Sequence, residues 1–468
     1  MKRFRTVNIL SIIFFFILLI QLHKMLTDRL FISQAKTWIF RSDDVSSGNT
    51  TVQGNTARQQ QHNNVNDTPS IKVIPREKIP QLPLYPLKTN PTYYANTFNR
   101  MERQPNCQDL IRQSASEIQY VQQALHFYRN RTFLTDELLA RETQYCQNPI
   151  YQSYPNISLS QEEKYYPIAF SLTVYRNAEQ VERLIRSIYT PQNYYCIHVD
   201  KKSPPAFLQA MMNYAKCFNN IIVLNLISVI PATFSRIQAD LYCMKSLLFH
   251  HHNWKYWINL SGEEYPLMTN KELVRYLKSL HGQNEIESIA ATHLKARYQY
   301  HYYLSTQGQY LRSQTVKPPL QSGNIQIYKG DSFIAATYEF CNFIIHNATA
   351  RIVLNYFRDT FLPSENIWAT FQRLDGIPGA IHLNYSYQNK PILSKSRLTN
   401  WGTTHCYGWW VNGLCTYAVG DLRWLFDKAG EYYLFASKVD IKRDHVVIDC
   451  IELARRDRMM QEIATTIF

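Results

Sequence analysis

Residues 168–200 read IAFSLTVYRNAEQVERLIRSIYTPQNYYCIHVD, and this stretch decides the fold. Two apolar runs, Ile168–Val174 and Tyr194–Val199, are each bounded by turn residues, a pattern typical of buried strands. Between the runs, apolar residues recur at helical spacing among charged ones, at Val181, Leu184, Ile185 and Ile188. A strand, a helix and a second strand joined by short links predict the βαβ unit of a parallel sheet.

The same alternation continues downstream. The sequence predicts a third strand over 221–226, a helix around 238–249 and a fourth strand over 256–260. No glycine-rich phosphate loop of the dinucleotide or P-loop type opens any of the expected helices, which argues against those two ligand classes. Helically spaced apolar residues begin near Cys107, so we expect an α/β domain with a mostly parallel central sheet over 106–468.

The carboxyl ends of the first two strands carry the first candidate ligand-binding residues. In open parallel sheets, ligands bind in the crevice beyond these ends. The candidates are Thr173, Val174, Tyr175 and Asp200, together with the neighbouring Lys201 and Lys202. Asp200 could hold a ribose hydroxyl there, or it could serve as a turn or helix-cap residue, and the spacing alone favours neither role.

The N-terminus contains one apolar segment, Val7–Leu22. Its length matches a helix across one thin bilayer, and the basic residues before it favour a cytosolic N-terminus. A cleaved signal peptide is the alternative, but no small-x-small cleavage site follows the segment. We therefore expect a cytosolic tail at 1–6, a transmembrane signal-anchor at 7–26 and a flexible lumenal stem at 27–105, where Gln, Asn, Ser, Thr and Pro dominate.

The nine cysteines are scattered without the short paired spacings of zinc sites, so disulfides in an oxidising lumen are the better interpretation. Eight of them could pair, with one left over. Asn-x-Ser/Thr triplets, which are candidate N-glycosylation sites, begin at Asn49, Asn66, Asn130, Asn156, Asn259, Asn347 and Asn384. The formal net charge of +14 is spread along the chain, which argues against nucleic acid as a partner and favours a small anionic substrate.

Several segments resemble one enzyme family closely. The segments PQNYYCIHVD at 191–200, SRIQADLYCM at 235–244 and NWKYWINLSG at 253–262 are similar to segments of the core 2 and I-branching β1,6-N-acetylglucosaminyltransferases. The family's order continues with IWATFQR, GDLRWL and FASK at 367–373, 420–425 and 435–438. The resemblance, which spans roughly Cys107 to Cys450, implies a GT-A-like fold and a type II Golgi membrane protein. It also implies an inverting transfer without a metal cofactor, and the expected lumenal part contains no Asp-x-Asp pair, which agrees.

The resemblance also implies a catalytic base. Inverting transfer needs a carboxylate that takes the proton of the acceptor hydroxyl as its oxygen attacks the anomeric carbon. In the family this base is a glutamate just before the Trp-Ala-Thr segment, and Glu365 holds that position here. From the sequence alone, Ser364 would cap a helix and Glu365 would lie in its first turn, where the helix dipole favours it.

On the donor side, the match to the family is incomplete. Lys438 matches the lysine that neutralises the diphosphate of a UDP-sugar, but the arginine that accompanies it in the family is Asn412 here. The lost charge-assisted contact is worth about 1.5–3 kcal/mol. Either Lys442 or Arg443 substitutes for it, or donor use is weaker or altered.

The acceptor side is also a partial match. Glu287, Arg297 and Trp401 align with acceptor-binding residues of the family, although a one-residue gap separates the first two. A tyrosine of the family is Thr403 here, and the aspartate of its Gly-x-Asp-Phe-Pro segment is Glu264. These changes suggest an acceptor, or even a donor sugar, that differs from those of the core 2 enzymes.

Eight cysteines fall on the family's disulfide positions. The resemblance implies the pairs Cys107–Cys450, Cys146–Cys217, Cys196–Cys243 and Cys406–Cys415. Cys341 is extra, and we expect it to be buried and unpaired.

These observations lead to one main functional hypothesis. We expect an inverting β1,6-N-acetylglucosaminyltransferase of the Golgi membrane that moves N-acetylglucosamine from UDP-GlcNAc onto a glycoprotein O-glycan, as in core 2-type branching. One alternative is an enzyme of the same superfamily that transfers another sugar, such as xylose or glucose. A catalytically silent, lectin-like Golgi protein is the other. The sequence leaves the oligomeric state open, including a homodimer.

Overall fold

The structure is a computed structural model, and it describes residues 104–127, 134–156, 160–290, 292–320, 325–381, 390–402 and 404–467. All of them belong to one compact unit, Tyr85–Phe468. The expected cytosolic tail, signal-anchor and nearly all of the stem lie outside the described residues. Among the helices that the structure describes, none is long and apolar enough to cross a membrane.

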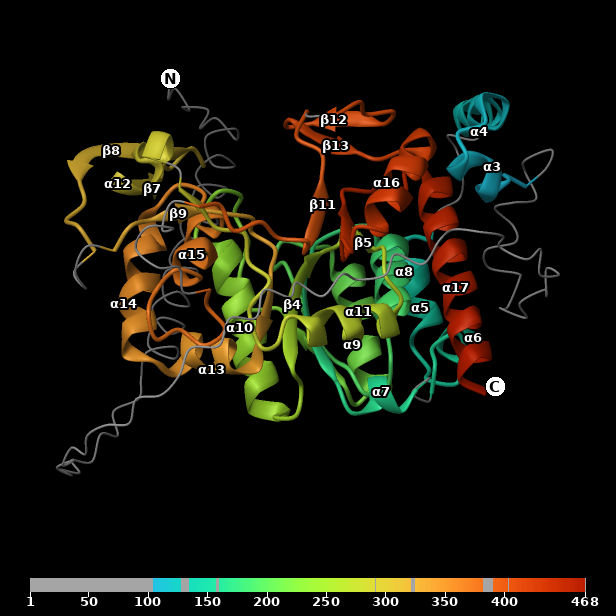
Figure 1. The fold of residues 1–468 in the computed structure, drawn as a ribbon, viewed down its shortest axis with the longest axis horizontal. Coiled ribbons are helices and arrows are strands. Elements are labelled where there is room, and N and C mark those ends of the chain that lie inside the picture. The colour runs from blue at the N-terminus through green and yellow to red at the C-terminus, as the bar shows by residue number, and fades with distance from the viewer. Residues whose placement is uncertain are drawn as a thin grey trace, which may run out of the picture. The chain divides into compact units, whose positions relative to one another are not determined.

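A five-stranded sheet forms the centre of the domain (Figure 1). In the order β10-β4-β1-β2-β3, its strands span Ala335–Thr337, Tyr256–Ser261, Ile168–Val174, Tyr194–Val199 and Ile221–Leu224. Strands β1 to β4 run parallel, and β10 pairs antiparallel with β4 at one edge. The mostly parallel sheet expected from the sequence is confirmed, with a third strand two residues shorter than predicted.

The pleat of β1 separates two apolar cores, because alternate side chains of a strand point to opposite faces of a sheet. Phe170 and Leu172 belong to the core that α8 and α9 cover, whereas Ala169 belongs to the core that α10 and α13 cover. Figure 1 shows these two pairs of helices on opposite sides of β4. The four helices span Ala178–Ile188, Pro205–Cys217, Ser235–His250 and Tyr338–His346. Each aliphatic side chain buried this way stabilises the fold by about 1.5–3 kcal/mol.

Short strands build the rest of the domain around the carboxyl ends of the sheet. A second sheet has the order β11-β14-β5, with bounds Arg397–Thr399, Phe435–Ser437 and Glu264–Pro266. Three two-stranded pairs are β6 with β9, β7 with β8, and β12 with β13. Their bounds are Ile289–Ala290, Tyr328–Lys329, Tyr300–Leu304, Tyr310–Val316, Trp409–Val411 and Leu414–Thr416.

The remaining described helices surround these sheets. From α3 to α7 they span Cys107–Ile111, Ala115–Phe127, Asp136–Glu142, Pro149–Gln152 and Gln161–Lys164. Helices α11, α12, α14 and α15 span Asn270–Ser279, Ala296–Gln299, Ala348–Tyr356 and Ser364–Phe371, and α16 and α17 span Leu422–Ala429 and His445–Ile467. Short 3₁₀ turns occupy Thr292–Leu294, Phe357–Asp359 and Val419–Asp421.

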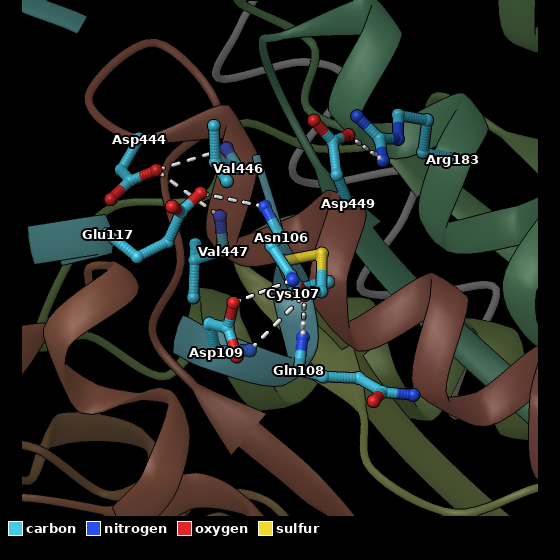
Figure 2. Close-up of a disulfide and its surroundings, with 11 residues drawn as sticks. Asn106, Cys107, Gln108, Asp109, Glu117, Arg183, Asp444, Val446, Val447 and Asp449 are labelled. Carbon is cyan, nitrogen blue, oxygen red and sulfur yellow. Dashed lines mark hydrogen bonds and ion pairs between the residues drawn. A yellow bond between two sulfur atoms is a disulfide. The ribbon is translucent and has the colours of Figure 1, made fainter. Parts of the chain in front are cut away.

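The first and last parts of the described chain meet at a disulfide between Cys107 and Cys450 (Figure 2). Beside it, the Asn106 side chain caps α3 by accepting from the backbone amides of Gln108 and Asp109. Asp444 accepts at 3.0 Å from the amide of Val446, in the first turn of α17. Both helices therefore begin with a capping side chain next to the covalent link.

The cysteine expectations are confirmed. The structure contains the pairs Cys107–Cys450, Cys146–Cys217, Cys196–Cys243 and Cys406–Cys415. Cys341 on α13 is free and buried, as expected. Cys196 and Cys243 join β2 to α10, so this bond fastens the helix that covers one face of the central sheet.

Candidate active site

Glu365 lies in the first turn of α15, as the sequence predicted. The expected cap is wrong, because Pro363 holds the N-cap position and Ser364 is the first helical residue. The Ser364 hydroxyl instead accepts a hydrogen bond of 2.8 Å from the Ser332 hydroxyl, which ties α15 to the loop before β10. Glu365 thus stands at the positive end of a helix, where a carboxylate is favoured.

The Glu365 carboxylate is paired with Arg297. Arg297 Nη1 donates to Glu365 Oε2 at 2.6 Å, and about a quarter of each side chain is exposed. The sequence suggested these residues separately, one as the base and one as an acceptor contact. The fold brings them into direct contact, and a charge-assisted bond of this kind fixes the position of the carboxylate.

The loop around Gly330 holds the acceptor-side residues next to this pair. The Gly330 amide donates to the Glu365 carbonyl at 2.7 Å. A Cβ atom on Gly330 would lie 2.1 Å from the backbone oxygen of Glu287, so only glycine permits this approach. The Glu287 carboxylate lies 3.7 Å from Lys329 Nζ, on β9. Glu287, Arg297 and Glu365 are therefore gathered at one place.

Asp331, which follows Gly330, is a site residue that the sequence did not suggest. Burial raises the pKa of its carboxyl to about 6, against the hydrogen bond from the Phe333 amide and the charge of Arg397. The charges of Glu287 and Glu264 raise the pKa of Asp331 further. No sequence signal marked Asp331, because it lies in a short loop without periodicity.

Lys438 follows β14 and faces the end of β1. Its Nζ lies 2.7 Å from Glu263 Oε2, and Arg176 Nη2 lies 2.8 Å from the other oxygen of the same carboxylate. Burial would lower the pKa of Lys438, but the charges of Glu263 and Glu264 raise it above its usual value. The Arg176 guanidinium also lies 4.9 Å from the ring centroid of Tyr175. Glu263 and Arg176, which the sequence did not suggest, thus connect the predicted Tyr175 and Lys438.

Asn412 occupies the turn between β12 and β13. Asn412 and Gly413 have φ values of 52° and 80°, and the two residues join antiparallel strands. Asn-Gly is the preferred pair for a two-residue hairpin turn that needs positive φ at both positions. The Asn412 side chain is exposed, and its replacement of the family's arginine therefore has a backbone explanation.

The other aromatic and cationic candidates border this hairpin. Trp401 is exposed, and it follows Asn400, whose carbonyl accepts from the amide of Cys415 on β13. The Arg443 guanidinium lies over the ring of Trp409 on β12, at 5.4 Å from the centroid. Thr403 lies outside the described residues.

The residues at the ends of β1 and β2 have mixed outcomes. The Thr173 hydroxyl, near the carboxyl end of β1, accepts from Arg236 Nη1 at 3.3 Å. Val174 is only 1% exposed and its carbonyl accepts from the Asp200 amide. The Val174 side chain packs in the core, where a Cβ on Gly262 would meet it, so only its backbone is left for a contact with the donor, and that contact stays a prediction.

Asp200 serves the turn role that the sequence left open. Its carboxylate accepts from the backbone amides of Lys202 and Val229, and Lys202 Nζ lies 2.8 Å from Oδ2. The backbone amide of the exposed Lys201 donates to the carbonyl of Ile227, which lies with Val229 in the loop after β3. These contacts fix the loop after β3 to the end of β2, while contact of Asp200, Lys201 or Lys202 with a nucleotide stays a prediction.

The glycosylation triplets differ sharply in position. Asn259 is fully buried on β4, and its amide donates to Asp240 and to the Ser332 carbonyl, so a glycan at Asn259 is incompatible with this packing. Asn347 caps α14 through the amide of Thr349. Asn156 is exposed. The other four candidates, Asn49, Asn66, Asn130 and Asn384, lie outside the described residues.

One group of possible metal ligands occurs in the described part of the chain: Cys406, Cys415 and Asp421. The two cysteines form a disulfide, and Asp421 accepts from the amides of Tyr407 and Ala418. The sulfur atoms and the carboxylate of this group are therefore already used in a disulfide and in hydrogen bonds that stabilise the fold.

Comparisons with known proteins point in one direction. A family model described as Core-2/I-Branching enzyme matches residues 168–426. A β-1,3-galactosyl-O-glycosyl-glycoprotein β-1,6-N-acetylglucosaminyltransferase 3 from Rattus norvegicus is 34% identical over 74% of this chain and 82% of its own length. A human enzyme, β-1,3-galactosyl-O-glycosyl-glycoprotein β-1,6-N-acetylglucosaminyltransferase, is 34% identical over 76% of this chain and 86% of its own length. An N-acetyllactosaminide β-1,6-N-acetylglucosaminyl-transferase from Mus musculus is 34% identical over 71% of this chain and 84% of its own length.

Proposed function

Because the chain belongs to the Core-2/I-Branching enzyme family, we propose that it is an inverting β1,6-N-acetylglucosaminyltransferase acting on glycoprotein O-glycans. Its donor is UDP-GlcNAc. The observation that carries the proposal is the contact between Glu365 and Arg297 beside Glu287, because it provides a positioned carboxylate next to acceptor-side residues.

The chemistry follows from this arrangement. The 6-hydroxyl oxygen of the acceptor sugar attacks C1 of N-acetylglucosamine from the face opposite the diphosphate. The new O–C1 bond forms as the bond from C1 to the β-phosphate oxygen breaks, and UDP leaves with that electron pair. Glu365 takes the hydroxyl proton, so the charge on the attacking oxygen never builds up. Arg297 keeps the carboxylate in place before transfer.

The departing UDP needs cationic stabilisation, and Lys438 is the residue that supplies it. Its ammonium group stands at the carboxyl end of β14, and its raised pKa keeps it charged at neutral pH. We propose that Lys438 carries this role without a resident metal ion.

The setting of the reaction is also part of the proposal. The segment at 7–26 anchors the chain in the Golgi membrane, and the stem at 27–105 connects it to the lumenal domain. A glycosyltransferase in this position reaches passing glycoproteins. Four disulfides support an oxidising compartment.

A donor panel tests the proposal. The purified protein is incubated with a Galβ1,3GalNAc acceptor and UDP-GlcNAc, UDP-xylose or UDP-glucose, each with and without EDTA, and the product linkage is determined by NMR. We expect transfer from UDP-GlcNAc into a β1,6 linkage, unchanged by EDTA. Transfer of xylose or glucose instead would overturn the donor assignment. Glycan binding without any UDP binding would favour a lectin-like protein, and loss of turnover that only a divalent cation restores would show a metal requirement.

A further inference from the structure

One carboxylate at the donor side holds two cations. Glu263 accepts from Lys438 at one oxygen and from Arg176 at the other, at 2.7 and 2.8 Å. The Glu263 side chain is 19% exposed, whereas those of Arg176 and Lys438 are 52% and 38% exposed. The two cationic groups therefore reach solvent from either side of a mostly covered carboxylate.

The backbone that carries these three residues is fixed. Gln180, which is fully buried on α8, donates to the carbonyls of Gly262 and Val439 and accepts from the amide of Ile441. The Val439 amide in turn donates to the Glu263 carbonyl at 2.9 Å. One side chain thus ties the segments that hold Glu263 and Lys438 to the helix that follows Arg176.

The location matches the donor side of an α/β enzyme. Arg176 lies two residues after the last residue of β1, and Lys438 lies directly after β14. Ligands of such sheets bind beyond these strand ends. Tyr175, between β1 and Arg176, is half exposed and lies against the Arg176 guanidinium.

Arg176 and Lys438 offer hydrogen-bond donors suited to an anion with several oxygen atoms. The pKa of Glu263 stays below its usual value, because Lys438 and Arg176 outweigh the effect of burial. The charge of Glu264 also acts on Lys438, and that of Asp440 acts on Arg176, so the carboxylates hold both cations in their charged form. A guanidinium also offers parallel N–H donors that match two phosphate oxygens, which an ammonium alone does not.

We propose that Arg176, together with Lys438, binds the diphosphate of the donor, so that Arg176 supplies the second cation that Asn412 does not. Glu263 is a positioning residue that holds both cations toward the same point. This inference rests on the proposed function. Arg443, the other nearby arginine suggested by the sequence, has different contacts: it lies over Trp409 and its Nε is 3.6 Å from Asp440, whereas Arg176 shares the Glu263 carboxylate with Lys438.

A purely structural Arg176 would affect stability alone, and the test separates the two roles. Calorimetry measures the affinity of the full-length protein for UDP and for uridine, in the unmodified protein and in Arg176→Met and Arg176→Lys. We expect Arg176→Met to weaken UDP binding about 10- to 100-fold, Arg176→Lys to recover part of the loss, and uridine affinity to stay unchanged.

Arg423→Met on α16 is the matched control, because Arg423 is an exposed arginine paired with Asp427 outside the site, and we expect it to change neither affinity. Thermal unfolding of each variant shows that the fold is intact. Unchanged UDP affinity in Arg176→Met would overturn the inference and leave the proposed function standing. An equal loss of UDP and uridine affinity would also overturn it, because the diphosphate would not be the group bound. An unmodified protein that binds no UDP would overturn the proposed function, and the inference with it.

Discussion

Two acidic residues, Glu365 and Asp331, lie on segments that are in contact, and they differ in their surroundings. Glu365 has a direct arginine partner at 2.6 Å and lies in the first turn of a helix. The pKa of Asp331 is raised mainly by burial and further by the charges of two nearby carboxylates, so its neutral form is favoured. The family resemblance placed Glu365 in the sequence, but neither its contact with Arg297 nor the presence of Asp331 could be predicted from local pattern.

Asp331 gives a prediction for stability against pH. Its pKa is raised from 3.8 to about 6 in the folded protein, so between these values the folded state binds the extra proton and stability falls as pH rises. Above pH 6 the full penalty of burying the charge is present. Asp331→Asn removes the charge and can still accept from the Phe333 amide, so its melting temperature at pH 8 should exceed that of the unmodified protein by about 2–5 °C.

The control for Asp331→Asn is the same comparison of melting temperatures at low pH. Well below pH 3.8 the Asp331 carboxyl is protonated in both the folded and the unfolded states, and the two melting temperatures should converge. A variant that is no more stable at pH 8, or that keeps the same advantage at that low pH, would contradict the assigned burial of this carboxyl.

At the scale of elements, long periodic segments were predictable and short ones were not. Strands β1 and β2 have the predicted bounds, because an uninterrupted apolar run is itself the cause of a fully buried parallel strand. Helix α9 was missed, since its apolar positions give only a weak pattern. The three-residue strands β5, β11 and β14 form through pairing between distant segments, which no local window of sequence contains.

The hairpin of β12 and β13 shows the limit of residue-by-residue transfer from a family. The alignment assigned Asn412 to the donor side, where the family has an arginine. The fold gives Asn412 a turn conformation at positive φ, and we assign the cationic role to Arg176, which follows β1, instead. Our proposal thus keeps the chemistry expected of the site and assigns it to a different residue.

At the scale of the whole molecule, the Cys107–Cys450 bond connects residues separated by 343 positions. Its pairing was predicted from the family's disulfide positions, because nine scattered cysteines alone do not determine connectivity. The fold explains its location, since α3 and α17 both begin beside it (Figure 2).

Loss of this bond should cost more stability than loss of a short-range one. In the chain-entropy model, replacing Cys107 and Cys450 by serine lowers the free energy of unfolding by about 5–6 kcal/mol. The matched control replaces Cys406 and Cys415, whose separation is 9, and should cost about 3 kcal/mol. Urea unfolding of both double variants measures the difference, and an equal or smaller cost for the long-range pair would contradict this account.

The most direct test of the central claim is turnover by Glu365→Gln with UDP-GlcNAc and a Galβ1,3GalNAc acceptor. Glutamine keeps the size of the side chain but cannot take the proton, so transfer should fall by about 10²- to 10⁴-fold while UDP affinity is unchanged. Glu431→Gln, at an exposed glutamate paired with Lys428, is the control and should retain full activity. Turnover retained by Glu365→Gln would show that another group is the base.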